Sequence, residues 1–307
     1  MKILRPLMAF SIFSLFGCGE SPGTPVDDFC GPALARVDSF TATFQGREAP
    51  GDRYGGTVVV GTVGELSAGM NAFQAAQAAT AQHHMFVNLM TLIRYDEELQ
   101  PEPYLADSWE VSEDLTDLTF HLRDDVRWHD GEPTTAYDVE FTFLRASDPE
   151  MGFPNPGFFQ YYEQGSAGVE VVDSFTVRFH FQRPHADFMD PWRTVSIMPR
   201  HLLGDVPVPE LAQHPFGTVC PVGNGPFRFV SHAPGAQWIF EANPAFPEGL
   251  GGRPYLDRYV YRIIPETSTL LAELLTGGVD VYVSVLPHLT GRPSLREGLA
   301  KDNRVQQ

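Results

Sequence analysis

A short run of alternating apolar and polar residues near position 120 constrains the fold of this chain more than any other feature. Leu118, Phe120 and Leu122 are each separated by one polar residue. This is the period of a β-strand that buries one face and exposes the other to water. We therefore expect a strand here with its apolar face turned toward a core.

The residues that follow predict a second strand, a turn and a helix. Val126 and Trp128 resume the alternation, and the segment 129–133 (HDGEP) supplies the glycine and proline of a chain reversal. Thr135 with Asp138 three positions later has the form of a capping box at the start of a helix. The stretch 103–145 thus predicts two strands, a turn and a capped helix.

The same stretch resembles the signature of family 5 extracellular solute-binding proteins, which include the oligopeptide, dipeptide and nickel receptors of ABC importers. The resemblance lies in LADSWEVSED at 105–114, TFHLR at 119–123, VRWHDGEP at 126–133 and YDV at 137–139. Two positions depart from the pattern: Leu115 stands where the family usually has a turn glycine, and Asp117 interrupts an apolar or hydroxyl position.

Later segments continue the resemblance. They are VEVVDSFTVRFHF at 169–181, the segments 184–188 and 197–203, PVGNGPFRF at 221–229 and LLAELLTGGVDVYV at 270–283. In PVGNGPFRF, Asn224 replaces the threonine of the family motif. The two glycines that flank it permit a tight backbone approach. The resemblance implies an α/β fold with mixed sheets, of the type II periplasmic-binding-protein class.

The resemblance also implies a division into lobes. Residues 55–290 are expected to form the solute-binding domain, with 55–85 and 195–290 building the first lobe and 86–194 an inserted second lobe. Relatives are longer, and residues 291–307 would only begin their distal lobe. We therefore expect a truncated form that carries one wall of the ligand cleft, and weak or no affinity for a solute in this chain alone.

The N-terminus predicts export. Lys2 and Arg5 precede an apolar run over 7–16, which is too short for an ordinary membrane-spanning helix and typical of a signal peptide. The sequence LFGC ending at Cys18 resembles a bacterial lipobox, in which that cysteine is lipidated. The alternative is a plain signal peptide with an incidental cysteine.

Residues 19–54 are rich in Gly, Pro, Ser and Asp and show little periodicity, so we expect a flexible linker between the lipid anchor and the domain. With Cys18 lipidated, Cys30 and Cys220 remain, and an oxidising compartment would allow them to pair. Two free thiols are the alternative.

The formal net charge of -18 disfavours nucleic acid as a partner, because binding phosphates requires clustered Lys and Arg. The expected partners are a peptide or another small solute, an ABC permease complex, and a membrane reached through the lipid anchor. No cofactor and no metal are expected.

Four residues are candidate ligand contacts. The loop 62–69 follows the first strand, at 56–61, and its family counterpart faces the ligand cleft, so Glu65 and Ser67 are candidates. The alternative for Glu65 is a solvated loop carboxylate. Asn88, near the end of an Ala-rich helix expected over 72–93, and Asn224 are the other two; the loop containing Asn224 is expected to be structural first.

Other expectations concern secondary structure. His83 and His84 are adjacent, so they point to different faces of the expected helix and are interpreted as surface or capping residues. The aromatic-rich segment 151–168 predicts an ordered loop. The remaining expected elements are hairpins over 169–181 and 227–241, a strand at 259–264, a helix at 267–276 and a strand at 279–283.

Three functional hypotheses follow. The first is the substrate-binding component of an ABC importer, lipid-anchored outside the cytoplasmic membrane, in a periplasmic or extracytoplasmic location. The alternative is a non-transporting envelope lipoprotein that uses this lobe as an interaction module. The third is an enzyme, but G-x-S-x-G, H-E-x-x-H, P-loop and paired CxxC motifs are missing from the sequence, and His121, His129 and Asp130 lie on the unit shared with non-catalytic relatives.

Overall fold

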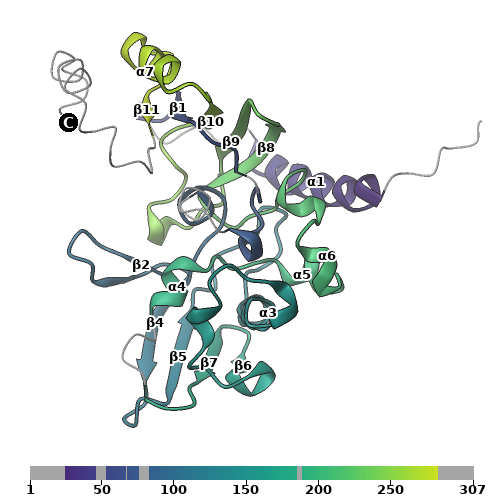
Figure 1. Cartoon of the computed structure of the whole chain (residues 1–307), viewed down its shortest axis with the longest axis vertical. Helices are drawn as coiled ribbons and strands as arrows, with labels where there is room; N and C mark the ends of the chain where they lie inside the picture. Colours follow the sequence, from purple (N-terminus) through teal and green to yellow (C-terminus); the bar gives the residue numbers. More distant parts are fainter. Residues whose placement is uncertain (1–24, 46–52, 67, 76–82, 185–188, 283–307) are drawn as a thin grey trace, which may run out of the picture.

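The computed structural model describes residues 25–45, 53–66, 68–75, 83–184 and 189–282 (Figure 1). Two sheets lie at opposite ends of this body, with helices and irregular segments between and around them. The predicted signal peptide and Cys18 lie outside the described residues. Among the helices of the described part, none combines the length and the apolar character that crossing a membrane requires.

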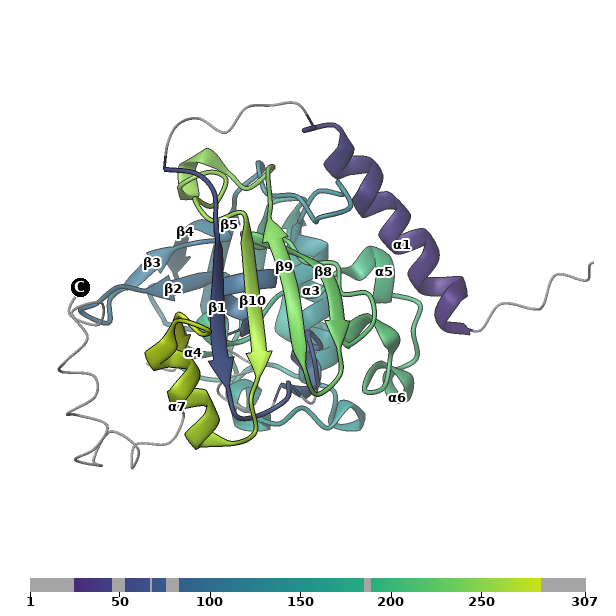
Figure 2. The ribbon, with the colours of Figure 1, turned by 90° about the horizontal axis from the view of Figure 1, so that it is seen from above.

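A five-stranded sheet forms one end of the body, with strand order β11-β1-β10-β9-β8. β1 pairs in parallel with both β10 and β11, whereas β10, β9 and β8 pair antiparallel (Figure 2). The strands are β1 (Thr57–Thr62), β8 (Phe227–Ala233), β9 (Gln237–Ala242), β10 (Arg258–Ile263) and β11 (Val281–Tyr282). The hairpin and strands that the sequence predicted in these regions are confirmed.

Helix α7 (Thr267–Thr276) connects β10 to β11 and confirms the helix predicted there. It ends at Gly277, whose φ of 82° lies in the left-handed region that glycine adopts without a steric penalty. Because β10 and β11 are parallel to β1, their carboxyl ends meet at one edge of the sheet, and the loop after β1 begins at that edge.

A four-stranded antiparallel sheet forms the other end, in the order β4-β5-β7-β6. Leu118, Phe120 and Leu122 of β5 are buried and alternate with half-buried polar residues, as predicted. The strands are β4 (Ala106–Val111), β5 (Asp117–Leu122), β6 (Val169–Asp173) and β7 (Thr176–His180).

Two strands form an arm that projects from the side of the body between the sheets (Figure 1). They are β2 (Ile93–Tyr95) and β3 (Pro101–Pro103), which pair antiparallel. Leu99 lies in the turn between them with 75% of its surface exposed and a positive φ of 60°. Leu115, in the turn before β5, also has a positive φ, of 59°. At the position where the family usually has a turn glycine, Leu115 therefore adopts the left-handed backbone conformation.

The predicted capped helix is α3 (Ala136–Ala146), and its capping box is present. The carboxylate of Asp138 accepts a hydrogen bond from the Thr135 N–H at 2.9 Å. The second strand predicted around Val126 and Trp128 was wrong. Both side chains are fully buried, but the backbone there makes only an isolated bridge between Arg127 and Pro133 as it enters the turn.

Helix α1 (Pro25–Ala42) occupies most of the described part of the predicted linker 19–54, so that prediction was wrong for this stretch. The helix runs along the flank of the body near α5 (Figure 2). Its residues Cys30, Ala33 and Val37 are buried, with spacings of three and four that place them on one helical face. That apolar face packs on the body, which explains why the segment folds.

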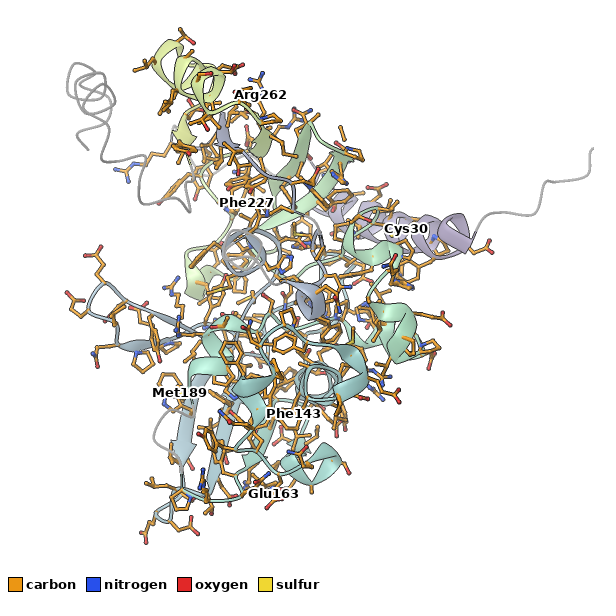
Figure 3. The ribbon with its side chains drawn as sticks, in the orientation of Figure 1. Cys30, Phe143, Glu163, Met189, Phe227 and Arg262 are labelled. Atoms are coloured by element: carbon orange, nitrogen blue, oxygen red, sulfur yellow. A yellow bond between two sulfur atoms is a disulfide. The ribbon has the colours of Figure 1, made fainter. Side chains whose placement is uncertain are left out.

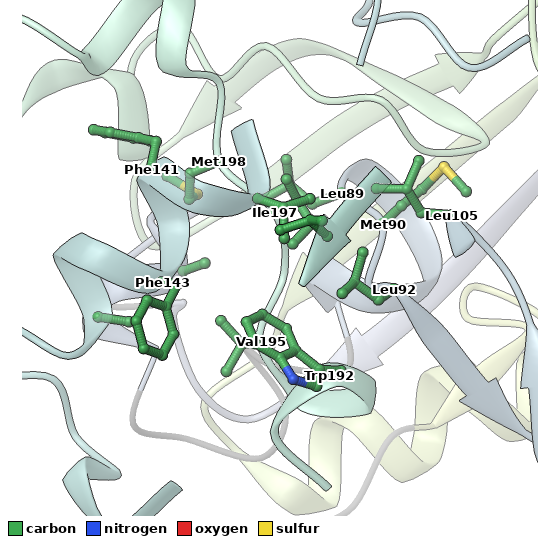
Figure 4. Close-up of a cluster of buried hydrophobic side chains, with 14 of the residues drawn as sticks. Leu89, Met90, Leu92, Leu105, Phe141, Phe143, Trp192, Val195, Ile197 and Met198 are labelled. Carbon is green, nitrogen blue, oxygen red and sulfur yellow. The ribbon is translucent and has the colours of Figure 1, made fainter. Parts of the chain in front are cut away.

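The largest hydrophobic core belongs to the four-stranded sheet and also includes Ala33 and Val37 of α1 and many residues between Met189 and Val222. Figure 4 shows part of it, with Trp192, Val195 and Ile197 near Leu89 and Leu92. By packing, the segment 189–222 belongs with the sheet of the predicted inserted lobe. The lobe boundaries given above remain a prediction.

Aromatic rings gather where this core meets the segment 151–168. Trp192 stacks on Phe179 with ring centroids 4.2 Å apart, and Phe159 and Tyr162 pack on Phe143, which Figure 3 labels. The ordered loop predicted here is a series of short 3-10 turns, η3 (Pro149–Met151), η4 (Pro156–Phe159) and η5 (Gly165–Gly168).

The helix predicted over 72–93 is not continuous in its described parts. It begins with η1 (Ala72–Gln74), and a π-helical turn, η2 (His84–Asn88), ends at Leu89, which is extended. Within the described residues, the remaining helices are α4 (Asp190–Thr194), α5 (Arg200–Leu203), α6 (Val208–Leu211), η6 (Pro215–Gly217) and η7 (Glu248–Leu250).

Candidate functional site

The candidate ligand residues fall in two places: the loop after β1, and the crossing where the chain passes between the two sheets. Glu65 belongs to the first place. Asn88 and Asn224 belong to the second. Ser67 lies outside the described residues, so its predicted role stays a prediction.

Glu65 lies at the carboxyl edge of the five-stranded sheet and binds the hairpin between β8 and β9. Its Oε1 accepts hydrogen bonds from Trp238 Nε1 at 2.8 Å and from the Leu66 N–H at 2.9 Å. Its Oε2 accepts one from the Gly235 N–H at 2.8 Å and lies 3.5 Å from His232 Nε2. Both oxygens are therefore occupied by groups of the protein itself.

The environment of Glu65 favours the charged carboxylate. Burial alone would raise its pKa, but the hydrogen bonds from Trp238, Gly235 and Leu66 and the nearby His232 together lower the pKa of Glu65 below its ordinary value. His232 stacks on Trp238 at 3.6 Å between ring centroids, and its Nδ1 donates to the Thr218 carbonyl at 3.0 Å. Glu65 thus fixes the loop after β1 to the hairpin, and its predicted ligand contact stays a prediction.

The crossing between the sheets is a compact network of backbone and amide groups around Asn224. Asn224 Oδ1 accepts a hydrogen bond from the Met90 N–H at 2.9 Å, and its Nδ2 lies 3.4 Å from Thr134 Oγ1. The Gly225 N–H donates to the Asn88 carbonyl at 2.9 Å. A Cβ at Gly223 would lie 1.9 Å from the Asn88 carbonyl oxygen, so the glycine is required for this close approach.

His129 completes the network as a neutral ring. Its Nδ1 accepts a hydrogen bond from the Gly223 N–H at 3.2 Å, and its Nε2 donates to the Gly225 carbonyl at 3.0 Å. Burial lowers the pKa of His129 to about 4, against the opposing effect of the bond to Gly225. The histidine of the HDGEP turn therefore ties this turn to the loop that precedes β8.

Asn88 and Asn224 are both fully buried in this network. Asn88 Nδ2 donates to the Phe227 carbonyl at 3.2 Å, while its Oδ1 has no hydrogen-bond partner. Neither side chain reaches the surface described here, which fits the structural role expected for the Asn224 loop. Their ligand contacts stay predictions.

Cys30 and Cys220 form a disulfide, with their Cα atoms 5.6 Å apart (Figure 3 labels Cys30). Arg36 of the same helix lies 3.4 Å from the buried carboxylate of Asp130, which also lies 2.9 Å from His201 Nε2. Burial would raise the pKa of Asp130, but His201 and Arg36 lower it. Helix α1 is thus held by a covalent bond and an ion pair.

The interpretation of His83 and His84 as surface or capping residues was wrong, because both are buried. His83 packs among Phe240, Tyr259 and Tyr261 and neither ring nitrogen has a hydrogen-bond partner. His84 Nε2 donates to the Gly69 carbonyl. Burial lowers the pKa of His83 to about 3 and that of His84 to about 4.

An apolar groove lies beside the crossing, and no motif in the sequence predicted it. It has a volume of about 470 Å³ and lies between Phe86 of η2, the base of the β2–β3 arm, the start of β8 at Phe227 and the loop 243–257. Phe86 and Tyr255 at its rim are each 56% exposed. Across the described ranges, no group of three or more His, Cys, Asp or Glu side chains is arranged to hold a metal ion.

Comparison with known protein families gives one match to this chain. The model of the bacterial extracellular solute-binding proteins, family 5 Middle, matches residues 100–304. The oligopeptide-binding protein AppA of Bacillus subtilis is 28% identical over 74% of this chain and 40% of its own length. Di/tripeptide-binding protein 4 of Pseudomonas aeruginosa is 32% identical over 64% of this chain and 38% of its own length.

Solved structures agree with the sequence comparison. The structure of AppA in complex with a nonapeptide superposes with a TM-score of 0.68 over 74% of this chain and 43% of AppA, at 28% identity. NikZ of Campylobacter jejuni in complex with Ni(L-His) superposes with a TM-score of 0.67 over 80% of this chain and 45% of NikZ, at 26% identity. This chain spans less than half the length of these relatives.

Proposed function

Because this chain belongs to family 5 of the bacterial extracellular solute-binding proteins, we propose that it is a substrate-binding component of an ABC importer that binds peptides outside the cytoplasmic membrane. The observation that carries the proposal is the family match over residues 100–304. Two relatives named for peptide binding, one of them solved with a nonapeptide, support peptides as the solute class.

We propose that the described residues supply one wall of the binding cleft. In open α/β sheets ligands bind outside the carboxyl ends of the parallel strands, and the loop of Glu65 lies at that edge. Glu65 itself is engaged with Trp238 and Gly235, so its contribution is to hold the loop in a fixed shape. Binding between lobes that close around a solute would require a second wall.

The N-terminal features extend the proposal to the envelope. A signal peptide cleaved before Cys18 would place the protein outside the cytoplasm, where its Cys30–Cys220 disulfide is stable. Lipidation of Cys18 would keep it at the membrane, near a permease. The proposed role involves binding and release of a solute and no chemical conversion.

Peptide binding is tested by a method that detects weak as well as tight complexes. Saturation-transfer NMR with a mixture of peptides of two to nine residues should give transfer to peptide protons. Nickel-histidine and a disaccharide, tested by competition, should not displace the peptides. Displacement by nickel-histidine at lower concentration than any peptide would contradict the proposed solute class.

Attachment and export are tested separately. Metabolic labelling with a radioactive fatty acid should label the wild-type protein in bacterial cells and not the Cys18→Ser variant. Labelling that persists in Cys18→Ser would contradict the proposed anchor, and recovery of the wild-type protein in the cytoplasm with its N-terminus uncut would contradict export.

A further inference from the structure

The arm formed by β2 and β3 ends in an apolar side chain that the fold leaves uncovered. Leu99, in the turn between the two strands, exposes 75% of its surface, more than any other large apolar side chain of the described residues. Its φ of 60° lies in the left-handed region, which glycine or asparagine adopts at a lower cost. The geometry of the turn therefore does not explain why a leucine stands at the tip.

The residues beside Leu99 give the tip a negative charge. Asp96 Oδ1 accepts hydrogen bonds from the N–H groups of Glu98 and Gln100, at 3.0 and 2.7 Å, and so closes the turn. Glu97 and Glu98 are exposed, and within the described ranges neither carboxylate is engaged in an ion pair. The tip thus presents one leucine beside two unpaired carboxylates.

The apolar groove beside the crossing lies at the base of the same arm, where Arg94 and Tyr104 belong to its lining. Phe86 and Tyr255 at its rim are each 56% exposed, while Tyr104 is almost entirely buried. Large apolar side chains that gather around a hollow mark sites of interaction, whereas single exposed ones are ordinary. The groove therefore offers an apolar site to a side chain of another molecule.

The charge of the groove is opposite to that of the tip. Its lining contains the guanidinium groups of Arg94 and Arg253 but no carboxylate. Arg94 donates through its Nε to Glu102 at 3.1 Å, and Arg253 donates to Asp257 and to the Pro254 carbonyl. A guanidinium has five N–H groups, so both keep donors for a further carboxylate. The tip thus matches the groove in charge as well as in apolar character.

An arm cannot place its own tip in the groove at its own base. Ile93 pairs with Pro103 at the base and Tyr95 with Pro101 near the tip, so the two strands hold Leu99 away from the body (Figure 1). The tip and the groove of one copy are, however, available to a second copy. In a twofold symmetric dimer each tip would meet the groove of the other copy, and the two contacts would be identical.

We propose that two copies of this chain form a dimer by exchanging their arms. Leu99 of each copy enters the groove of the other between Phe86 and Tyr255, and Glu97 and Glu98 face the guanidinium groups of that groove. The two contacts are small, so the dimer is weak and transient. The inference goes beyond the proposed function, which gives the arm and the groove no role, and it holds independently of solute binding.

Sedimentation velocity of the full chain from low to high micromolar concentration should show a monomer that converts to a dimer. Leu99→Ser removes the apolar tip and Phe86→Ser removes one side of the groove, and both should fold, because these side chains are more than half exposed. Each change damages both contacts and should raise the dissociation constant of the dimer at least about tenfold. Val172→Ser is the matched control, since Val172 is 45% exposed on β6 in the other sheet, and it should dimerise like the wild type.

The carboxylates at the tip are tested by changing their charge. The double variant Glu97→Lys, Glu98→Lys lowers the net negative charge of a chain that carries -18, and this alone would weaken the repulsion between copies. The proposed contact predicts the opposite result, a weaker dimer, because the lysines would face Arg94 and Arg253.

Mixing two damaged proteins tests the exchange itself. In a mixed dimer of Leu99→Ser and Phe86→Ser, one contact carries both changes and the other is intact, whereas each variant alone has no intact contact. Since the two changes act on one contact, their effects are not additive. The mixture should therefore dimerise more strongly than either variant alone at the same total concentration.

The inference fails if the wild type is a monomer at every concentration, or if Leu99→Ser and Phe86→Ser dimerise like the wild type. A dimer that Val172→Ser weakens equally would indicate general apolar association instead. A mixture no stronger than its components would exclude an exchange of arms, and a stronger dimer of the double lysine variant would exclude the charged contact. Solute binding is measured separately, so none of these results bears on the proposed function.

Discussion

Cys30 in helix α1 and Cys220 in the segment before the crossing are bonded to each other, although they are separated by 190 positions in the sequence. The bond closes a loop that contains most of the fold. It also fixes a helix whose buried face, at Ala33 and Val37, is part of the largest core. The N-terminal helix is therefore a component of the folded body.

Replacing either cysteine is expected to lower the free energy of unfolding by the same amount. Cys30→Ala and Cys220→Ala each open a loop of 190 positions, which costs about 5 kcal/mol in the chain-entropy account. Urea denaturation of both variants and of the reduced wild type should give the same midpoint. A wild type whose midpoint does not change on reduction would show that the bond does not stabilise the protein.

Leu115→Gly is expected to raise stability. A left-handed conformation costs a residue with a Cβ about 1–2 kcal/mol, and glycine avoids this cost but loses more backbone freedom on folding. The net gain should be about 0.5–1 kcal/mol by urea denaturation. Leu115→Ala is the control, since it shortens the same exposed side chain and keeps the Cβ. Equal stability of the two variants would contradict a steric cost at this φ.

Asn224→Ala is expected to destabilise the protein by about 1–3 kcal/mol, because the buried Met90 N–H would lose its acceptor. Asn224→Thr keeps an oxygen that can accept from this N–H and should cost less. Hydrogen exchange at Met90 provides a local measurement: it should accelerate in the alanine variant more than in the threonine variant. Equal exchange in both would show that the amide oxygen is not the relevant partner.

Acid is expected to destabilise the protein through His83. Burial lowers its pKa from 6.5 to about 3, so the folded state binds this proton less readily than the unfolded chain does. The neutral His83 ring contributes its full stabilisation of the folded state above about pH 6.5, and this contribution is lost as the pH falls toward 3. One buried histidine of this kind accounts for a loss of a few kcal/mol in this range.

His83→Phe tests this assignment, because the ring lies among aromatic side chains and makes no hydrogen bond. Thermal unfolding between pH 4 and pH 7 should show a shallower decline in the variant than in the wild type. A slope that stays the same in His83→Phe would exclude His83 as a cause.

The elements that could be predicted from the sequence are those that are determined by residues close to one another along the chain. The alternation of β5, the capping pair of Thr135 and Asp138 and the glycine stop after α7 are local signals, and all are present in the structure. The same kind of local signal wrongly predicted a strand at Val126 and Trp128. Their apolar side chains alternate with polar ones as in a strand. The Trp128 N–H, however, donates to the Glu132 carbonyl within the same turn and not to a neighbouring strand.

The rest depended on contacts between distant segments. Two adjacent histidines suggested a solvated helix, and only the strands of Phe240 and Tyr261, far along the chain, bury His83. Helix α1 carries a detectable pattern in Cys30, Ala33 and Val37, but its Gly, Pro and Asp content indicated a linker. The groove combines four separate segments, so no single stretch of sequence could reveal it.

The position of β1 in its sheet also bears on how the protein folds. Thr57 pairs with Arg258 and Val60 with Val281, whereas the four-stranded sheet is assembled entirely from residues 106–180. Contacts between distant segments form slowly because a long loop must close first. During synthesis, which begins at the N-terminus, the segment TVVVGT therefore has no strand to pair with until β10 and β11 have been made. An unpaired apolar strand of this kind is prone to aggregation in that interval.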